Sequence, residues 1–171
     1  MVKKRLFIDM DGTLARFHEH RNFAYEMYSE GFFLNLRPYQ EVCDAVNALA
    51  EEMDTDLFIL SSAATCRSNI PKQKREWIRK HLPCVKPENI VILPLDIPKS
   101  SVLHVGDILL DDYNKNLRDW ESYGGKAIKL VNDINDHGIT SPKWQGRRVR
   151  YDQTPDLIKS QILDVIRGGA A

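Results

Sequence analysis

The sequence predicts an α/β fold in which helices cover both faces of a mostly parallel sheet of five strands. Short apolar runs recur along the chain, and segments whose apolar residues have helical spacing separate them. Polar or acidic residues directly follow several of these runs, as they do where buried parallel strands end. The length of 171 residues, with 43% hydrophobic and 28% charged residues, suits one globular domain with a proper core.

Five apolar runs are the expected strands. The first covers residues 6–8, and its continuous Leu-Phe-Ile run is typical of a strand that is buried on both faces of a parallel sheet. The others cover residues 57–60, 90–93, 107–110 and 127–131. Residues 147–151 fit either an edge strand or a loop, and both interpretations stay open.

Helical patterns occupy the segments between these strands. The expected helices cover residues 38–53, 70–82, 114–123 and 155–166. Pro83 ends the second of them, Gly124 suits a left-handed cap after the third, and Thr154 suits the N-cap of the last. Because strands alternate with helices, we expect right-handed crossovers and a parallel sheet.

Two carboxylates follow the first strand. Asp9 and Asp11 flank Met10, and Gly12 then allows a tight turn, so this edge of the sheet can hold a divalent cation and aim one carboxylate at a substrate. Phosphoryl transfer suits such a pair. A calcium loop is excluded because its sixth and twelfth positions hold Leu14 and His20. A solvated turn after a strand stays open as the simpler interpretation.

Two more carboxylates, Asp111 and Asp112, follow the fourth strand. If the strands are neighbours, four acids meet at one edge, where they would repel one another unless a cation joins them. We therefore expect a Mg²⁺ site formed by Asp9, Asp11, Asp111 and Asp112. The five histidines show no paired zinc spacing and are expected at the surface or behind the metal ligands.

A second set of residues suits phosphate binding. Ser61 and Ser62 end the second strand, Lys99 precedes the fourth, and Lys74 lies in the expected helix 70–82. The simpler alternatives are that Ser61 only caps its strand, that Lys99 is an exposed loop lysine and that Lys74 is exposed on its helix.

These residues resemble a known family. The strings DMDGTL, LFILS and ILLDD, together with Lys99, look like the four motifs of the haloacid dehalogenase-like (HAD) phosphatases. The strings GFFLNLRP, SSA and LLDDYNKN, and a lysine three residues before Trp77, are similar to the 5'(3')-deoxyribonucleotidase branch. The resemblance covers most of the chain. It implies a Rossmann-like (HAD-like) three-layer fold, with residues 1–171 as a single hydrolase domain and a small helical, aromatic-rich cap insertion at about 15–37.

The resemblance also implies roles. Asp9 would be the nucleophile that forms an aspartyl phosphate, and Asp11 would be the acid/base. Mg²⁺ would be bound by Asp9, the backbone carbonyl of Asp11 and Asp112, with Asp111 nearby or acting through water. The phosphoryl oxygens would be held by Ser61, the amide of Ser62, Lys99 and Lys74.

The insertion would supply specificity. Six aromatic residues lie between residues 15 and 37, and Phe17 and Phe33 fall where the resembled branch stacks rings on the nucleobase. The alternative, that both rings only pack beneath a lid, stays open.

The expected function is that of a magnesium-dependent phosphomonoesterase acting on nucleoside or deoxynucleoside monophosphates. Other small phosphoesters, such as sugar phosphates or phosphoproteins, are the alternative, and a nucleotide-binding regulator without turnover is a third. With 24 basic and 24 acidic residues, the chain has no overall charge that would favour a nucleic-acid polymer or a membrane. Three cysteines without CxxC spacing, and no long apolar run, suggest a cytoplasmic protein. A homodimer is kept open.

Overall fold

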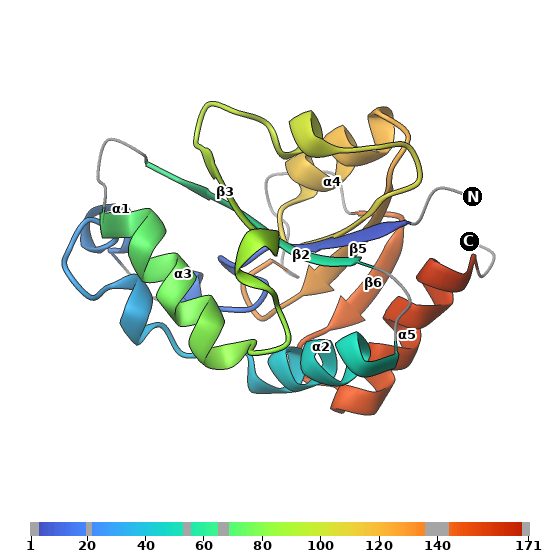
Figure 1. Cartoon of the computed structure of the whole chain (residues 1–171), viewed down its shortest axis with the longest axis horizontal. Coiled ribbons are helices and arrows are strands. Elements are labelled where there is room, and N and C mark those ends of the chain that lie inside the picture. The colour runs from blue at the N-terminus through green and yellow to red at the C-terminus, as the bar shows by residue number, and fades with distance from the viewer. Residues whose placement is uncertain (1–3, 20–21, 53–55, 65–68, 136–143, 169–171) are drawn as a thin grey trace.

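A six-stranded, fully parallel sheet forms the centre of the computed structural model, which describes residues 4–19, 22–52, 56–64, 69–135 and 144–168 (Figure 1). The strand order is β3-β2-β1-β4-β5-β6. The strands are β1 (Arg5–Ile8), β2 (Asp56–Ala63), β3 (Ile90–Pro94), β4 (Ile108–Asp111), β5 (Lys126–Val131) and β6 (Arg147–Arg150). The predicted α/β class and parallel sheet are confirmed.

The sheet has one strand more than expected. β6 pairs in parallel with β5 along the edge of the sheet, so the edge-strand interpretation of residues 147–151 is correct. Only Val149 of this strand is buried, whereas its three arginines are exposed. Charged side chains on an edge strand discourage pairing with other chains, and they also hide the strand from a search for apolar runs.

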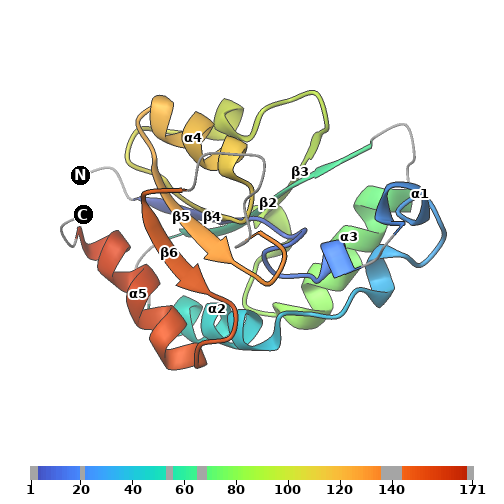
Figure 2. The same ribbon diagram turned by 180° about the vertical axis from the view of Figure 1, so that it is seen from behind.

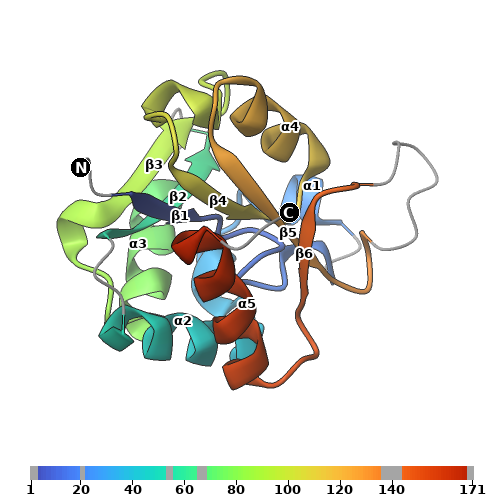
Figure 3. The same ribbon diagram turned by 90° about the vertical axis from the view of Figure 1, so that its right-hand side faces the viewer.

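Helices cover both faces of the sheet. The α-helices are α1 (Phe23–Glu26), α2 (Gln40–Glu52), α3 (Asn69–His81), α4 (Asn114–Ser122) and α5 (Pro155–Arg167). The 3-10 turns are η1 (Phe17–Glu19), η2 (Phe33–Asn35), η3 (Pro87–Asn89) and η4 (Lys99–Val102). Figures 1 and 3 show α4 on one side of the sheet and α2 and α5 on the other, and Figure 2 shows the same layers from behind. This is the expected three-layer arrangement.

The predicted helix boundaries hold to within two residues where they can be compared. Met53, the last residue expected in the first of them, lies outside the described residues. Gly124 has φ +90°, which confirms the left-handed cap after α4. The Thr154 hydroxyl accepts a hydrogen bond from the backbone N–H of Leu157 at the start of α5, which confirms the N-cap.

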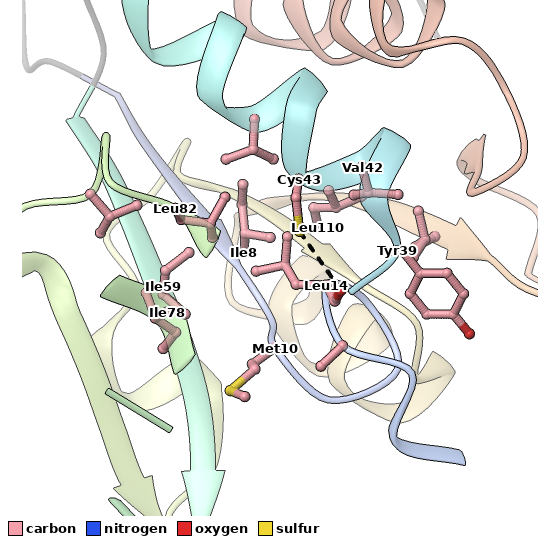
Figure 4. Close-up of a cluster of buried hydrophobic side chains, with 14 of the residues drawn as sticks. Ile8, Met10, Leu14, Tyr39, Val42, Cys43, Ile59, Ile78, Leu82 and Leu110 are labelled. Carbon is pink, nitrogen blue, oxygen red and sulfur yellow. Dashed lines mark hydrogen bonds between the residues drawn. The ribbon is translucent and has the colours of Figure 1, made fainter. Parts of the chain in front are cut away.

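The apolar core lies on both sides of the sheet because neighbouring residues of a strand point to opposite faces. Leu6 and Ile8 pack with apolar residues of α2, α3 and α5, whereas Phe7 packs with Leu117 and Trp120 of α4. Figure 4 shows part of the first cluster, in which the Cys43 thiol donates to the Leu14 carbonyl. Both layers hold β1 at the centre of the molecule.

The segment between β1 and α2 is built of short turns. Ala15 forms bridges to Asp11 and Pro38, so the two ends of the segment lie together beside the sheet. Its second half is attached to α3, where the Gln73 side chain accepts from the N–H of Phe33 and the Trp77 indole donates to the Leu36 carbonyl. The assignment of a single domain with an insertion at about 15–37 stays a prediction. None of the described helices has the length and apolarity needed to cross a bilayer.

Candidate active site

The carboxyl ends of β1 and β4 bring the predicted acids together. Ile8 pairs with Leu110 in parallel register, and the backbone N–H of Asp9 donates to the Leu110 carbonyl at 2.9 Å. Asp9 and Asp111 therefore stand side by side at the same edge of the sheet. Carboxylate oxygens of Asp9, Asp111 and Asp112 all lie within 4.8 Å of one another, and all three side chains are buried.

A tight turn after β1 completes this edge. Gly12 has φ +84°, and a Cβ at this position would overlap the Asp112 carboxylate, so both the backbone conformation and the close approach require glycine. The Thr13 hydroxyl donates to Asp9 Oδ2 at 3.4 Å and so helps to orient that carboxylate. The solvated-turn interpretation is wrong for this segment, because Asp9 and Thr13 are 5% and 0% exposed.

Lys99 is buried between two of the acids. Its Nζ lies 2.5 Å from Asp9 Oδ1 and 2.6 Å from Asp111 Oδ2. Burial alone would lower the pKa of Lys99, but the carboxylates of Asp111 and Asp9 outweigh it and raise that pKa, so the ammonium is charged. The alternative of an exposed loop lysine is contradicted by its exposed fraction of 6%.

Lys74 is the second buried lysine beside the acids, and it contacts Asp11. Its Nζ donates to Asp11 Oδ2, to Ser61 Oγ at 2.9 Å and to the Ser62 carbonyl at 2.7 Å. The side chain is 1% exposed, so the alternative of an exposed helix lysine is wrong. The ammonium also lies 4.6 Å from the centroid of the Phe33 ring. Lys74 therefore connects the acidic turn, the end of β2 and the aromatic segment.

The acidic cluster fits a divalent cation. Burial raises the pKa of Asp9 to about 8. Lys99 lowers this pKa, whereas the neighbouring carboxylates of Asp111, Asp11 and Asp112 raise it. Burial also raises the pKa of Asp112. Among the described residues, Asp11 Oδ1 is buried without a hydrogen-bond partner. Buried carboxylate oxygens that lack sufficient positive charge are the donor set that a hard cation such as Mg²⁺ prefers.

A cavity of about 640 Å³ opens above this cluster. Asp9, Asp11, Lys74 and Lys99 lie at its polar end. Its other walls carry mostly apolar or aromatic side chains, namely Phe17, Ala24, Met27, Tyr28, Phe33, Ala63, Ile70, Leu95 and Tyr113. A phosphate at the polar end could thus be joined to an apolar or aromatic group in the same cavity.

Phe17 and Phe33 both line this cavity and both pack. Their rings are stacked, with centroids 5.9 Å apart and planes 10° apart, and they are 7% and 1% exposed. Phe32 packs edge-on against each of them and does not line the cavity. Base stacking by Phe17 and Phe33 stays a prediction.

Two neighbours of the acids, His18 and Asn116, were not singled out from the sequence as site residues. His18 Nε2 lies 3.6 Å from Asp112 Oδ2, and the neighbouring Asp112 carboxylate raises the pKa of His18. The Asn116 amide donates to Asp111 Oδ2 at 3.0 Å. Asn116 lies inside the LLDDYNKN string and could have been found there, whereas the position of His18 depends on how the segment after β1 folds back.

Comparisons with known proteins identify the family of this chain. The family described as 5' nucleotidase, deoxy (pyrimidine), cytosolic type C protein matches residues 15–147. The cytosolic type 5'(3')-deoxyribonucleotidase of Homo sapiens is 27% identical over 203 residues, which cover 97% of this chain and 96% of the human protein. A crystal structure of D,D-heptose 1.7-bisphosphate phosphatase from B. bronchiseptica, complexed with magnesium and phosphate, has a TM-score of 0.59 at 12% identity, covers 94% of this chain and 98% of its own, and so shares the fold. The chain belongs to the deoxyribonucleotidase-type 5' nucleotidase family of HAD phosphatases and is a phosphoric monoester hydrolase.

Proposed function

We propose that this enzyme is a Mg²⁺-dependent nucleotidase that dephosphorylates nucleoside monophosphates through an aspartyl phosphate on Asp9. One observation carries the proposal. Four carboxylates and two buried ammonium groups meet at the polar end of a cavity whose other walls are largely apolar. The human relative is named for activity on deoxyribonucleotides, which supports a nucleotide as the substrate.

The metal would be held by the carboxylates of Asp9 and Asp112 and by the backbone carbonyl of Asp11, with Asp111 behind them against Lys99. A bound Mg²⁺ supplies the positive charge that lets one anion approach another. The pKa of Asp9 is raised to about 8 in the protein without a metal, which supports the need for a cation to keep this carboxylate charged. A nucleophilic carboxylate must be charged, and a nearby cation favours the charged form.

The chain's own groups would carry the covalent steps. An oxygen of Asp9 attacks phosphorus while the ester oxygen leaves with a proton from Asp11, which forms the aspartyl phosphate and the free alcohol. Asp11 then takes a proton from water, the water oxygen attacks phosphorus, and inorganic phosphate leaves with Asp9 restored. The hydrogen bonds from Lys99 and Thr13 hold the two Asp9 oxygens in a defined orientation before the reaction.

The phosphoryl oxygens would be bound by Ser61, the amide of Ser62, Lys74 and Lys99. Lys74 already contacts both serines, and Lys99 already contacts the proposed nucleophile. These donors would stabilise the charge that moves onto the phosphoryl oxygens in the transition state. The base would stack on Phe17 and Phe33, which line the wall of the cavity.

A substrate panel tests the proposal. Phosphate release is measured with deoxynucleoside and nucleoside monophosphates and with sugar phosphates, in Mg²⁺ and in EDTA. We expect turnover of nucleotides that EDTA abolishes and Mg²⁺ restores. Equal turnover of sugar phosphates would instead favour a general phosphatase. Thermal stabilisation by nucleotides without any phosphate release would favour a regulator. A homodimer and a cytoplasmic location stay predictions.

A further inference from the structure

A turn after β5 lies behind the acidic site and had no role in the sequence analysis. Asn132 follows β5 directly and is 1% exposed. Its side-chain oxygen accepts from the N–H groups of Ile134 (3.0 Å) and Asn135 (2.9 Å). The side-chain oxygen of Asn135 accepts from the N–H of Asn132 at 3.0 Å. Both side-chain oxygens are thus used within the turn, and their NH₂ groups point to other parts of the chain.

These NH₂ groups bind the backbone of the active site. Asn132 Nδ2 donates to the Gly12 carbonyl at 2.9 Å, across a sequence separation of 120 residues. Asn135 Nδ2 donates to the Asp112 carbonyl at 3.2 Å and to the Leu130 carbonyl at 2.8 Å. β5 pairs with β4 and not with β1, so Asn132 reaches past the end of β4 to the turn after β1. One turn therefore ties together the two segments that carry the acids.

Gly12 and Asp112, which the turn holds, also lie against each other. A Cβ on Gly12 would overlap the Asp112 carboxylate, so the Gly12 backbone forms one wall of the space that this carboxylate occupies. An oxygen of the same carboxylate lies within 4.8 Å of carboxylate oxygens of Asp9 and Asp111. A shift of either backbone segment would therefore move Asp112 relative to the other two acids.

We propose that Asn132 and Asn135 are positioning residues that hold Asp112 in place for metal binding. This inference rests on the proposed function. Neither side chain contacts the proposed nucleophile or the cavity, so their effect would pass through Gly12 and Asp112. Hydrogen bonds behind metal ligands typically change metal affinity by about 10- to 100-fold when they are removed.

The variants Asn132→Asp and Asn135→Asp test this. Each keeps the side-chain oxygen that stabilises the turn and replaces the NH₂ donor with an oxygen. The Mg²⁺ dissociation constant of the substrate-free protein is measured by calorimetric titration. We expect it to rise about 10- to 100-fold in each variant. Added negative charge by itself would tighten binding of a divalent cation, so weaker binding must come from the lost position of Asp112.

Asn89→Asp is the matched control. The Asn89 amide donates to the Leu57 carbonyl at 2.9 Å, near the start of β2. The acids lie at the other end of the strands, where β1 and β4 finish. This variant loses the same kind of hydrogen bond and gains the same charge, so it should lose thermal stability but keep the Mg²⁺ dissociation constant.

The outcomes separate this inference from the proposed function. Weaker Mg²⁺ binding in the turn variants and unchanged binding in Asn89→Asp would support it. Unchanged binding in a turn variant that circular dichroism shows to be folded would overturn it and leave the proposed function intact. An unaltered enzyme that binds no Mg²⁺ would overturn both. If one of the two turn variants unfolds, the Mg²⁺ dissociation constant of the other variant tests the inference. If both unfold, the two asparagines have a folding role and the inference is overturned.

Discussion

The acidic end of the cavity and the aromatic wall above it are held in different ways. Asp9 and Asp111 lie at the ends of paired central strands, and backbone hydrogen bonds join these strands across about one hundred residues of sequence. The aromatic wall contains Phe17 of η1 and Phe33 of η2, which are 3-10 turns of three residues each, and the part around η2 is attached to α3 through the side chains of Gln73 and Trp77. Under the proposed function, the chemistry would therefore depend on the sheet, whereas specificity would depend on a segment that can vary with little effect on the sheet.

Lys74 is the point where these two regions meet. Its ammonium group contacts Asp11 and Ser61 on the sheet side and the Phe33 ring on the aromatic side. Substitutions in the acidic end should therefore lower kcat, those in the aromatic wall should raise KM, and Lys74 should affect both. The following changes test this division.

The largest effect is expected for Asp9→Asn. The amide cannot form the aspartyl phosphate, so kcat should fall by about 10⁴-fold or more while the fold is kept. Steady-state phosphate release measures this, and thermal unfolding serves as the control. Activity within tenfold of the unaltered enzyme would remove Asp9 as the nucleophile.

Asp11→Asn should lower kcat by about 10²- to 10⁴-fold, because it removes the acid/base in both steps. With p-nitrophenyl phosphate the leaving group needs no proton, so only the second step should stall. Rapid-mixing kinetics should then show a burst of about one nitrophenol per enzyme before slow turnover. Normal turnover without a burst would contradict the assigned role.

Phe17→Leu should raise KM for nucleoside monophosphates at least about fivefold, because stacking of a base on an aromatic ring is worth about 1–3 kcal/mol. KM for ribose 5-phosphate, which has no base, should not change. Phe32→Leu is the matched control, since Phe32 packs against the same rings outside the cavity. An equal rise in KM for both substrates would indicate that Phe17 only packs.

The smallest effect is expected for Arg37→Ala. The Arg37 side chain is 76% exposed and pairs with Glu19 at 2.5 Å near the end of the segment. Exposed ion pairs contribute about 1 kcal/mol or less, so the free energy of unfolding should fall by no more than this, with kcat and KM unchanged. Chemical denaturation measures the change, and a loss of several kcal/mol would show that the segment is more tightly coupled to the fold than the comparison implies.

The acidic end could be predicted from sequence because its signal is local. An apolar run that stops at Asp9 or Asp111 marks both a strand and the side chain at its end. The burial of Lys74 also has a local signal. Lys74 lies four residues after Ile70 and three before Trp77, on the buried face of α3, but its charge suggested the exposed face.

Other features have no local signal. The sequence allows either an edge strand or a loop at β6, and only the pairing with β5 decides between them, because exposed arginines replace the expected apolar run. Asn132 resembles any asparagine in a loop until the parallel sheet brings it to Gly12.

The sequence by itself determined the fold class, the strand ends and the residue types of the site, since apolar periodicity and the chemistry of carboxylates are properties of short segments. Only the tertiary structure decided that both lysines are buried against the acids, that Phe17 and Phe33 line the same cavity, and that a turn after β5 donates hydrogen bonds to the backbone carbonyls of Gly12 and Asp112. These contacts join residues far apart in sequence, and they depend on strand order and register, which no short segment specifies.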